Sequence, residues 1–406
     1  MAEVDSEEDK IAVVGHSGIR PDTDIRLMAR PRTPTITAHT MTICQVTFSP
    51  LLMDAHPQGD DIALLKDLQR NHGEWATIRR YQTLKEGEYW SPADEQQFES
   101  NEAGHLVYLV VDSQTPNPLF QAPVTKPKVR IFSDWVHILD VGTGRGTWAI
   151  DVADSFPNAT VRGVDLYPPP ETWLPPNCIM EVDDVLQEWT WRDPFDLIHL
   201  RQMMGSFTPE EWGKFYKQCY EKLTPGGWIE QLEGNPRVRC DDASVPDDNH
   251  SLYFGKLCCE AADNWGRPIT WADQMKEELQ KAGFVDIHEK NYKWPIGPWP
   301  KDPILKEAGR LHYHQWTSGM EGWAMFFLTK YGVPKPWTND EAQILMAKVR
   351  KEIFNSRHHF YQVAKRVWAR KPTAEEAAAL KNKNKDRPEE AETSREPEIK
   401  QERDSV

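Results

Sequence analysis

A glycine-rich loop at residues 138–148 is the stretch of this chain best suited to chemistry. It reads ILDVGTGRGTW, so an apolar strand ends in an acid and three glycines follow at alternate positions. Glycine adopts positive φ and lets the backbone approach a ligand closely. Strand, glycine loop and helix in this order cradle nucleotide-type cofactors in doubly wound sheets. The pattern predicts a cofactor site, and the alternative is a tight strand-to-helix turn without a ligand.

The spacing of the glycines distinguishes between cofactors. Dinucleotide sites use G-x-G-x-x-G, with free amides at a helix start for the pyrophosphate. Here the spacing is G-x-G-x-G, and Asp140 precedes it. A carboxylate there suits a cationic ligand without phosphate, such as S-adenosylmethionine, and disfavours an NAD-dependent oxidoreductase. The residues of this loop expected to bind the cofactor are Asp140, Gly142, Thr143, Gly144 and Gly146.

Acids also end the next two apolar segments. Residues 160–165 read TVRGVD, and Asp165 lies about twenty residues past the glycines, where a carboxylate accepts hydrogen bonds from ribose hydroxyls. Residues 178–185 read CIMEVDDV, a third strand whose terminal acids can accept a hydrogen bond from an adenine amino group. The additional candidates for cofactor binding are Asp165, Leu166, Asp183, Asp184 and Val185.

Two further candidates lie in a fourth strand, FDLIHLR at residues 195–201. Methyl transfer from a sulfonium depends largely on positioning, and it needs a general base only if the acceptor must lose a proton. His199 could accept that proton or orient the acceptor, whereas Arg201 could hold a carboxylate or pair with a cofactor-site acid. We take both as candidate catalytic residues. A hydrogen-bonded structural role for each is the alternative, and no general base is assigned.

The elements that position these residues alternate between strand and helix, which indicates a parallel sheet with right-handed crossovers. Thr208 and Glu211 form a capping box around Pro209 and begin a helix. We expect an α/β fold with a doubly wound, mostly parallel seven-stranded sheet of the Rossmann-like kind and a helical lid over 303–356. The other predicted elements are an extended segment at 106–111, strands at 228–232, 284–288 and 361–369, helices at 248–264, 271–282, 303–330 and 339–356, and a rigid aromatic loop at 294–300.

The order of these segments resembles that of the class I S-adenosylmethionine-dependent methyltransferases. More narrowly, it is similar to the fungal LaeA methyltransferase family, whose members include regulators of secondary metabolism and development. The resemblance covers roughly residues 74 to 370. Its motifs are LDVGTGRGTWAIDVA, GVDLYPPP, LPPNCIMEVDDVLQEWTW, FDLIHLRQMMGSF and LTPGGWIEQLE. Two positions depart from the family pattern: Gln82, where a histidine usually follows the tyrosine, and Arg145, where a smaller residue is more usual.

The resemblance implies S-adenosyl-L-methionine as the cofactor and velvet-domain or other regulatory proteins as partners. It leaves the methyl acceptor unknown, and a protein side chain, a small metabolite and the enzyme's own methionine all stay open. Three functions therefore compete: an active methyltransferase that regulates fungal metabolism, a cofactor-binding regulatory scaffold with little turnover, and a small-molecule methyltransferase of a biosynthetic pathway. The 17 tryptophans could roof an acceptor pocket, form a partner surface or fill the core.

Composition agrees with these expectations. The net charge of −15 disfavours direct binding to nucleic acid. The six cysteines show no C-x-x-C spacing, so we expect neither a metal site nor a disulfide framework. The acidic first residues do not resemble a signal peptide, and no apolar run approaches the ~20 residues that span a bilayer. We expect a location in the nucleus and/or cytoplasm.

We expect three regions along the chain. Residues 1–70 form a mostly disordered extension, and residues 71–370 form the methyltransferase domain. Within that domain the core spans 128–295 and the helical lid spans 303–356. Residues 371–406 form a charged, disordered tail that begins with an Ala-rich helical stretch.

Overall fold

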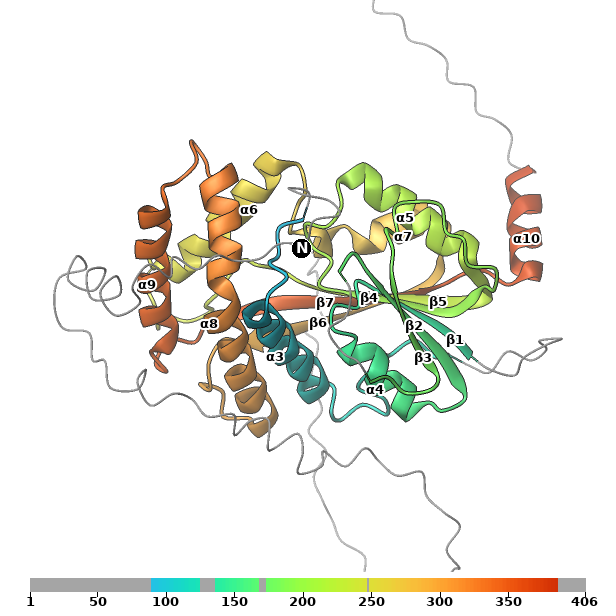
Figure 1. Ribbon diagram of the computed structural model, residues 1–406, viewed down its shortest axis with the longest axis horizontal. Coiled ribbons are helices and arrows are strands. Elements are labelled where there is room, and N and C mark those ends of the chain that lie inside the picture. The colour runs from blue at the N-terminus through green and yellow to red at the C-terminus, as the bar shows by residue number, and fades with distance from the viewer. Residues whose placement is uncertain (1–88, 125–135, 168–172, 247, 386–406) are drawn as a thin grey trace, which may run out of the picture. The chain divides into compact units, whose positions relative to one another are not determined.

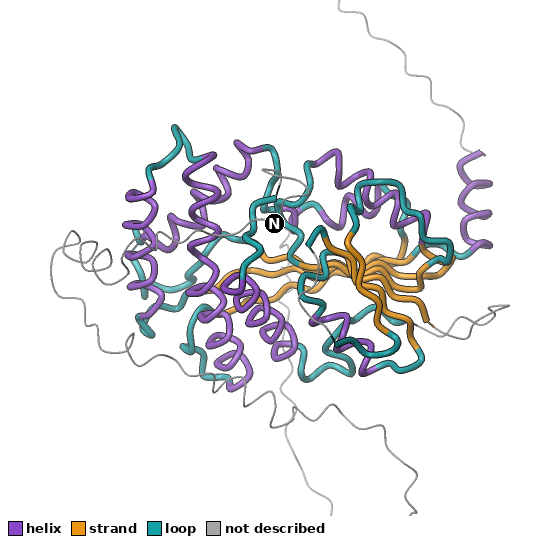
Figure 2. The backbone as a smooth tube through the Cα atoms, viewed as in Figure 1, coloured by secondary structure: helices purple, strands orange, loops and turns teal. Residues whose placement is uncertain are grey.

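One sheet organises the residues that this computed structural model describes, which are 89–124, 136–167, 173–246 and 248–385 (Figure 1). Its seven strands, orange in Figure 2, stand in the order β3-β2-β1-β4-β5-β7-β6. Neighbours from β3 to β5 are parallel, and β7 is antiparallel to β5 and β6. The predicted doubly wound, mostly parallel sheet is confirmed. The strands are β1 Val136–Val141, β2 Ala159–Asp165, β3 Cys178–Val182, β4 Phe195–Arg201, β5 Leu223–Gly234, β6 Val285–Pro295 and β7 Tyr361–Arg370.

Helices cover both faces of the sheet (Figure 1). Helix α4, Thr147–Ser155, packs its buried Trp148 and Val152 against the face that carries Val161 and Leu197. Helices α5, Pro209–Lys222, and α7, Met275–Lys281, cover the other face with a second apolar cluster. Burial on both faces explains why β1 and β4 are nearly all apolar. The polar side chains that remain concentrate at the strand ends.

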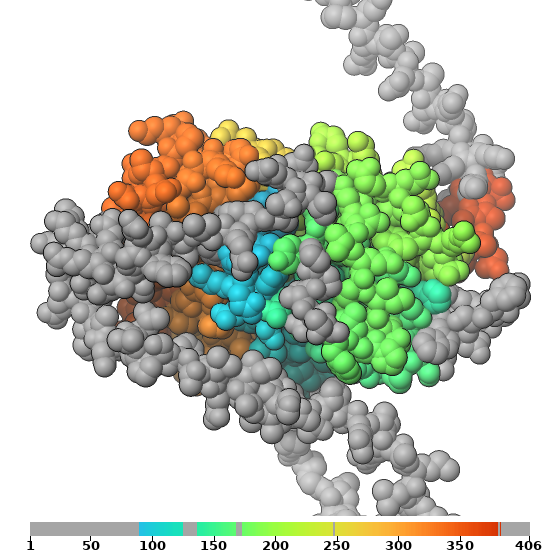
Figure 3. All heavy atoms as spheres, viewed as in Figure 1, coloured from blue at the N-terminus to red at the C-terminus, as the bar shows by residue number. Residues whose placement is uncertain are grey.

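Helix α3, Glu95–Val111, occupies the place where the sequence predicted an extended segment at 106–111, and that prediction was wrong. Asp94 caps the helix by accepting a hydrogen bond from the N–H of Gln97. The helix packs along α8, Pro303–Tyr331, where Gly104 lies so close that an added Cβ would meet the Gln315 side chain at 2.6 Å. This tertiary packing overrides the strand preference of the run YLVV. In Figure 3 the blue residues of α3 lie between the orange helical residues and the green residues of the sheet.

Three helices build the second half of the core. Helix α6, His250–Trp265, packs with α8 and with α9, Asn339–Phe354, around a large apolar cluster. The predicted helices at 303–330 and 339–356 are confirmed. The predicted aromatic loop at 294–300 was partly wrong, because β6 continues through Trp294 to Pro295 and pairs with β7 over that length.

The remaining predictions concern the ends of the chain and the helix at 271–282. That helix consists of the 3₁₀ turn η2, Trp271–Asp273, followed by α7, with Gly283 at φ +95° just past its end. Helix α10, Ala374–Lys385, is the Ala-rich stretch. The predictions for residues 1–70 and 386–406 lie outside the described residues. Within the described ranges, no helix is long and apolar enough to cross a membrane, and no group of metal-ligating side chains occurs.

Candidate active site

The glycine loop joins β1 to α4, and all three glycines adopt positive φ. The φ angles are +68° for Gly142, +58° for Gly144 and +86° for Gly146. An added Cβ on Gly142 would meet the Met203 sulfur at 2.2 Å, and one on Gly146 would meet Met180 at 2.3 Å. These two glycines are therefore required for packing as well as for backbone conformation.

Gly144 differs, because an added Cβ there would meet nothing within 4 Å. Gly144 lines a cavity of about 240 Å³ that also reaches the ends of β2, β3 and β4. A backbone that leaves open space at such a loop is what close approach of a ligand requires. This open cradle is the observation that fits the loop to S-adenosylmethionine.

Acids at the ends of β2 and β3 surround this part of the cavity. Asp165 accepts hydrogen bonds from the N–H of Gly144 at 2.8 Å and of Tyr167 at 3.1 Å. Burial raises the pKa of Asp165, although these backbone hydrogen bonds oppose the rise. Asp184 accepts hydrogen bonds from the N–H of Leu186 and the side chain of Gln187. The predicted cofactor residues that line the cavity are Gly142, Thr143, Gly144, Asp165, Leu166, Asp183, Asp184 and Val185.

Asp140 and His199 are not among the residues that line the cavity. The two side chains are buried and meet each other, with 2.8 Å between His199 Nδ1 and an Asp140 carboxylate oxygen. The other Asp140 oxygen accepts a hydrogen bond from Thr143 Oγ1, and the His199 ring stacks on Trp148 at 3.6 Å between ring centroids. Burial lowers the pKa of His199. In this geometry the pair holds the base of the glycine loop rather than facing a ligand.

Arg201 does line the cavity, at the end of β4. Its Nη2 donates to His105 Nδ1 at 2.6 Å, and His105 Nε2 lies 2.9 Å from a carboxylate oxygen of Asp151. The guanidinium also lies over the ring of Tyr108, 5.1 Å from its centroid. The sequence-predicted acids of the cofactor site do not pair with it.

The backbone turns sharply just past Arg201. Gln202 adopts φ +55°, which is uncommon for a residue with a side chain, and donates to the Tyr108 hydroxyl. The buried Glu233 carboxylate accepts the N–H of Met203 and of Met204, both at 3.1 Å. Burial raises the pKa of Glu233 to about 7, against the hydrogen bonds it accepts. Such local strain is typical of binding sites, where surrounding contacts hold it in place.

Beyond Met203 and Met204 the cavity has an aromatic wall from the C-terminal elements. His312, on α8, donates from Nδ1 to the carbonyl oxygen of Pro295 at 2.9 Å. Burial lowers the pKa of His312 to about 4, so the imidazole is neutral at neutral pH. The large aromatic side chains of this wall include Trp90, Phe254, Trp294, Trp316, Trp323 and Phe327.

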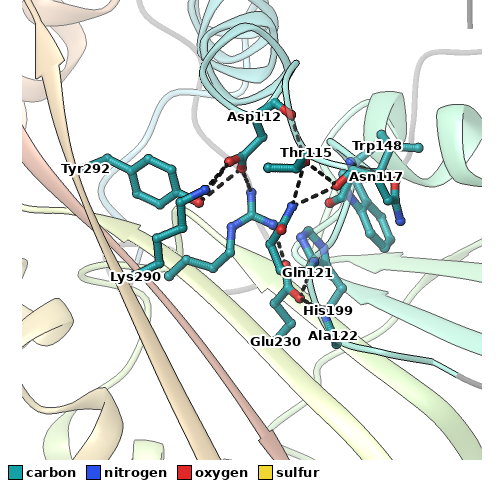
Figure 4. Close-up of polar contacts among 12 residues, drawn as sticks. Asp112, Thr115, Asn117, Gln121, Ala122, Trp148, His199, Glu230, Lys290 and Tyr292 are labelled. Atoms are coloured by element: carbon teal, nitrogen blue, oxygen red, sulfur yellow. Dashed lines mark hydrogen bonds and ion pairs between the residues drawn. The ribbon is translucent and has the colours of Figure 1, made fainter. Parts of the chain in front are cut away.

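A cluster of buried charges lies next to the site and explains how α3 is anchored (Figure 4). Arg366 of β7 pairs with Asp112, which caps the C-terminal end of α3, and with Glu230 of β5. Glu230 also accepts two backbone N–H groups, and Asp112 accepts hydrogen bonds from Lys290 and from the Tyr292 hydroxyl. In Figure 4 these residues lie between α3 and the sheet, with His199 and Trp148 beside them.

Sequence reasoning missed the contribution of α3. Gln97, Asn101, His105 and Tyr108 line the cavity from this one helix. Their spacing of four, four and three residues is helical, so the pattern was present in the sequence. It went unrecognised because 106–111 was taken as extended, and because nothing in the local sequence links α3 to β4.

Comparisons with known proteins agree with this geometry. A methyltransferase domain family matches residues 113–289. The methyltransferase pytC of Aspergillus terreus is 34% identical over 70% of this chain and 84% of its own length. The secondary metabolism regulator LAE1 of Cochliobolus heterostrophus is 34% identical over 74% and 94%. The protein-methionine methyltransferase laeA of Emericella nidulans is 32% identical over 75% and 78%.

One solved structure among those similar is the phosphoethanolamine N-methyltransferase 2 of Haemonchus contortus in complex with S-adenosylmethionine. It is 16% identical, with a TM-score of 0.38, over 68% of this chain and 57% of that one. This likeness adds nothing to the fold that the strand order already establishes. S-adenosylmethionine is the cofactor of this chain, and Gly144 and Asp165 are the residues best placed to hold it. By its sequence relatives and its strand order, the chain belongs to the LaeA-like family of class I methyltransferases.

Proposed function

We propose that this protein is an S-adenosylmethionine-dependent methyltransferase that regulates fungal secondary metabolism or development together with partner proteins. The observation that carries the catalytic part is the single cavity that runs from Gly144 to the aromatic wall around Trp316. A cofactor on the loop and an acceptor against the wall would share one enclosed space. The regulatory part is supported by the names of LAE1 and laeA, which cover most of the chain.

The chemistry asks little of the protein beyond orientation. Bound S-adenosylmethionine would supply an activated methyl group on a sulfonium. The chain's own residues would hold the reactants in line and exclude water, which supplies much of the acceleration in such displacements. His199 is occupied by Asp140 and Trp148, so it supports the loop instead of taking a proton from the acceptor.

Two acceptor classes have support from different observations. The printed name of the Emericella nidulans relative is a protein-methionine methyltransferase, and both Met203 and Met204 line the cavity of this chain. A small, largely apolar molecule is favoured instead by the aromatic wall and by the similarity to pytC. The regulatory role favours the protein acceptor, and we place the small-molecule methyltransferase second.

Partner binding needs exposed surface, and the tryptophans do not supply it evenly. Trp294 is buried in the cavity wall, and Trp299 is partly buried and donates to the carbonyl oxygen of Phe360. Exposed apolar side chains occur instead at Tyr253 and Phe354. The proposed partners are velvet-domain or other regulatory proteins, in the nucleus and/or cytoplasm.

The test is methyl transfer with labelled S-adenosylmethionine. Purified protein is incubated with the labelled cofactor alone, and then with a fungal cell extract separated into protein and small-molecule fractions. Mass spectrometry locates the label. Label on Met203 or on an extract protein supports the proposal, and label only in small molecules supports the second candidate. Absence of any label, with the cofactor bound, would favour the regulatory scaffold.

A matched pair of variants makes the result specific. Gly144→Val places a β-branched side chain in the cavity at φ +58° and should abolish both labelling and cofactor binding. Gly226→Val imposes similar backbone strain at φ +83°, but Gly226 does not line the cavity, so labelling should persist. Rescue of a deletion strain by Gly144→Val would show that methyl transfer is dispensable.

A further inference from the structure

We propose that Arg201 binds a ligand carboxylate in the cavity and that His105, supported by Asp151, holds the guanidinium in position for it. The proposal rests on the proposed function only in assuming that the cavity binds methyl donor and acceptor. It assigns a chemical group to a part of the site that the glycine loop and the strand-end acids do not explain.

The hydrogen bonds define the state of each group. An arginine only donates, so His105 Nδ1 must be the acceptor at 2.6 Å from Arg201 Nη2. The ring hydrogen is then on Nε2, which donates to Asp151 at 2.9 Å. Burial and the charge of Arg201 lower the pKa of His105, which keeps the imidazole neutral. One nitrogen of the guanidinium is thereby tethered, and its direction is set.

The positive charge of Arg201 is left without a carboxylate. No carboxylate of the described residues forms an ion pair with this guanidinium, whose recorded contacts are His105 and the face of Tyr108. Burial lowers the pKa of Arg201, which is the direction expected for a cation held away from water.

The nearby carboxylates are already engaged with other groups. Asp140 accepts from Thr143 and meets His199. Glu233 accepts the amides of Met203 and Met204. None of these is free to turn toward Arg201 without losing a hydrogen bond in a buried place, which is costly.

A guanidinium in the wall of a cavity matches a carboxylate, because its planar N–H groups pair with both oxygens at once. Two sources can supply that carboxylate. One is the methionyl carboxylate of S-adenosylmethionine, and the other is a carboxylate on the methyl acceptor. The shared chemistry is the same, and the two sources are separable by ligands that differ only in the carboxylate.

The experiment is calorimetry on the full chain, wild type against Arg201→Met and Arg201→Lys. S-adenosylhomocysteine is compared with 5′-methylthioadenosine, which keeps the nucleoside and the thioether but has no carboxylate. If the cofactor is the source, Arg201→Met weakens S-adenosylhomocysteine binding at least tenfold and leaves 5′-methylthioadenosine unchanged. Arg201→Lys retains part of the affinity, because it keeps the charge without the planar fork.

A second arm addresses the acceptor. With the protein saturated by S-adenosylhomocysteine, the shift in melting temperature produced by 1-naphthoate is compared with that produced by its neutral amide. If the acceptor is the source, the carboxylate shifts the wild type more than the amide does, and Arg201→Met removes the difference. The proposal is wrong if Arg201→Met binds S-adenosylhomocysteine as the wild type does and naphthoate and its amide act alike. It is equally wrong if the affinities for both nucleosides fall together.

The positioning role of His105 has its own test. His105→Asn places an oxygen near the former Nδ1, so it can still accept from Arg201 and should retain most of the carboxylate-dependent affinity. His105→Leu offers no acceptor and should lose affinity as Arg201→Met does. Equal losses in both variants would show a general packing role. These binding results hold whether or not the protein transfers a methyl group, so failure of the proposed function would appear separately in the labelling experiment.

Discussion

Two arginines that share the interior between α3 and the sheet have opposite surroundings. Arg366 is 1% exposed and pairs with two carboxylates that are themselves fully buried, Asp112 and Glu230. Arg201 lines the cavity and meets a neutral histidine and an aromatic ring. Burial alone would lower both pKa values, but the carboxylates raise the pKa of Arg366, whereas that of Arg201 stays lowered.

The difference separates a charge that holds the fold from a charge that is kept for a ligand. A buried ion pair contributes little net stability over apolar packing, yet removing one partner is strongly destabilising. An unpaired cation is a cost in the folded protein until a ligand arrives. The cluster around Arg366 therefore fastens α3 to the sheet, and the cavity beside it keeps an electrostatic demand that only a bound anion satisfies.

The largest effect is expected for Arg366→Met, which leaves two buried carboxylates without their cation. The free energy of unfolding should fall by about 3–5 kcal/mol. Urea denaturation measures it, with Arg370→Met as the control on the same strand. Arg370 pairs with Asp286 and Glu376, both about half exposed, so its loss should be about 1 kcal/mol or less. Equal losses would remove the distinction between buried and exposed clusters.

Acid should weaken the cavity wall through His312. Its folded pKa is about 4, below the value of 6.5 in the unfolded chain, so the folded state binds fewer protons between these values. Its contribution to stability is full above pH 6.5 and is lost as the pH falls toward 4, by about 3 kcal/mol. Urea denaturation at pH 7 and pH 4.5 should show a smaller loss in His312→Gln than in the wild type.

Glu233 provides a counter-test of the sign. Its folded pKa of about 7 exceeds the ordinary 4.5, so the wild type loses stability from this group as the pH rises between those values. Glu233→Gln should therefore gain stability relative to the wild type as the pH rises, opposite in slope to His312→Gln. Parallel slopes in the two variants would contradict both assignments.

Asp165→Ala should separate ligand binding from stability. The carboxylate accepts the N–H of Gly144 and faces the cavity. Loss of a charge-assisted hydrogen bond should weaken S-adenosylhomocysteine binding by about 1.5–3 kcal/mol. Calorimetry measures this change, while the melting temperature without ligand should move little. Undiminished affinity would mean that Asp165 does not bind the ribose.

The smallest effect is expected for the stability of Arg201→Met without ligand. Removing an unpaired charge from the cavity wall relieves a desolvation cost, so the free energy of unfolding should change by less than about 1 kcal/mol, or rise. The same urea measurement sets it directly against Arg366→Met. A loss as large as that of Arg366→Met would show that Arg201 is part of the structural cluster and would erase the contrast.

Much of the cofactor side of the site was predictable from the sequence. Strands of a parallel sheet are buried on both faces, so their polar residues concentrate at the carboxyl ends, where the ends of neighbouring strands meet. That rule places Gly144, Asp165 and Val185 together from local patterns alone, and the structure has all three at the cavity. Their role in binding stays a prediction, which the variants above test.

The same rule misled for Asp140 and His199 because side-chain depth was not visible. His199 lies two residues inside the end of β4, and Asp140 lies one residue inside the end of β1. Their side chains therefore enter the layer beneath α4, where Trp148 covers them, instead of projecting past the sheet. Arg201, at the last position of β4, is the residue that reaches the cavity.

By itself, then, the sequence determined the alternation of strand and helix, the glycine loop and the acids that follow it, because these depend on neighbours within a few residues. The tertiary structure alone decided that α3 is a helix, that it lies along α8, and that His105 meets Arg201 across nearly a hundred residues of chain. It also decided which buried arginine is neutralised. Those outcomes depend on packing and electrostatics between distant segments, which no local pattern encodes.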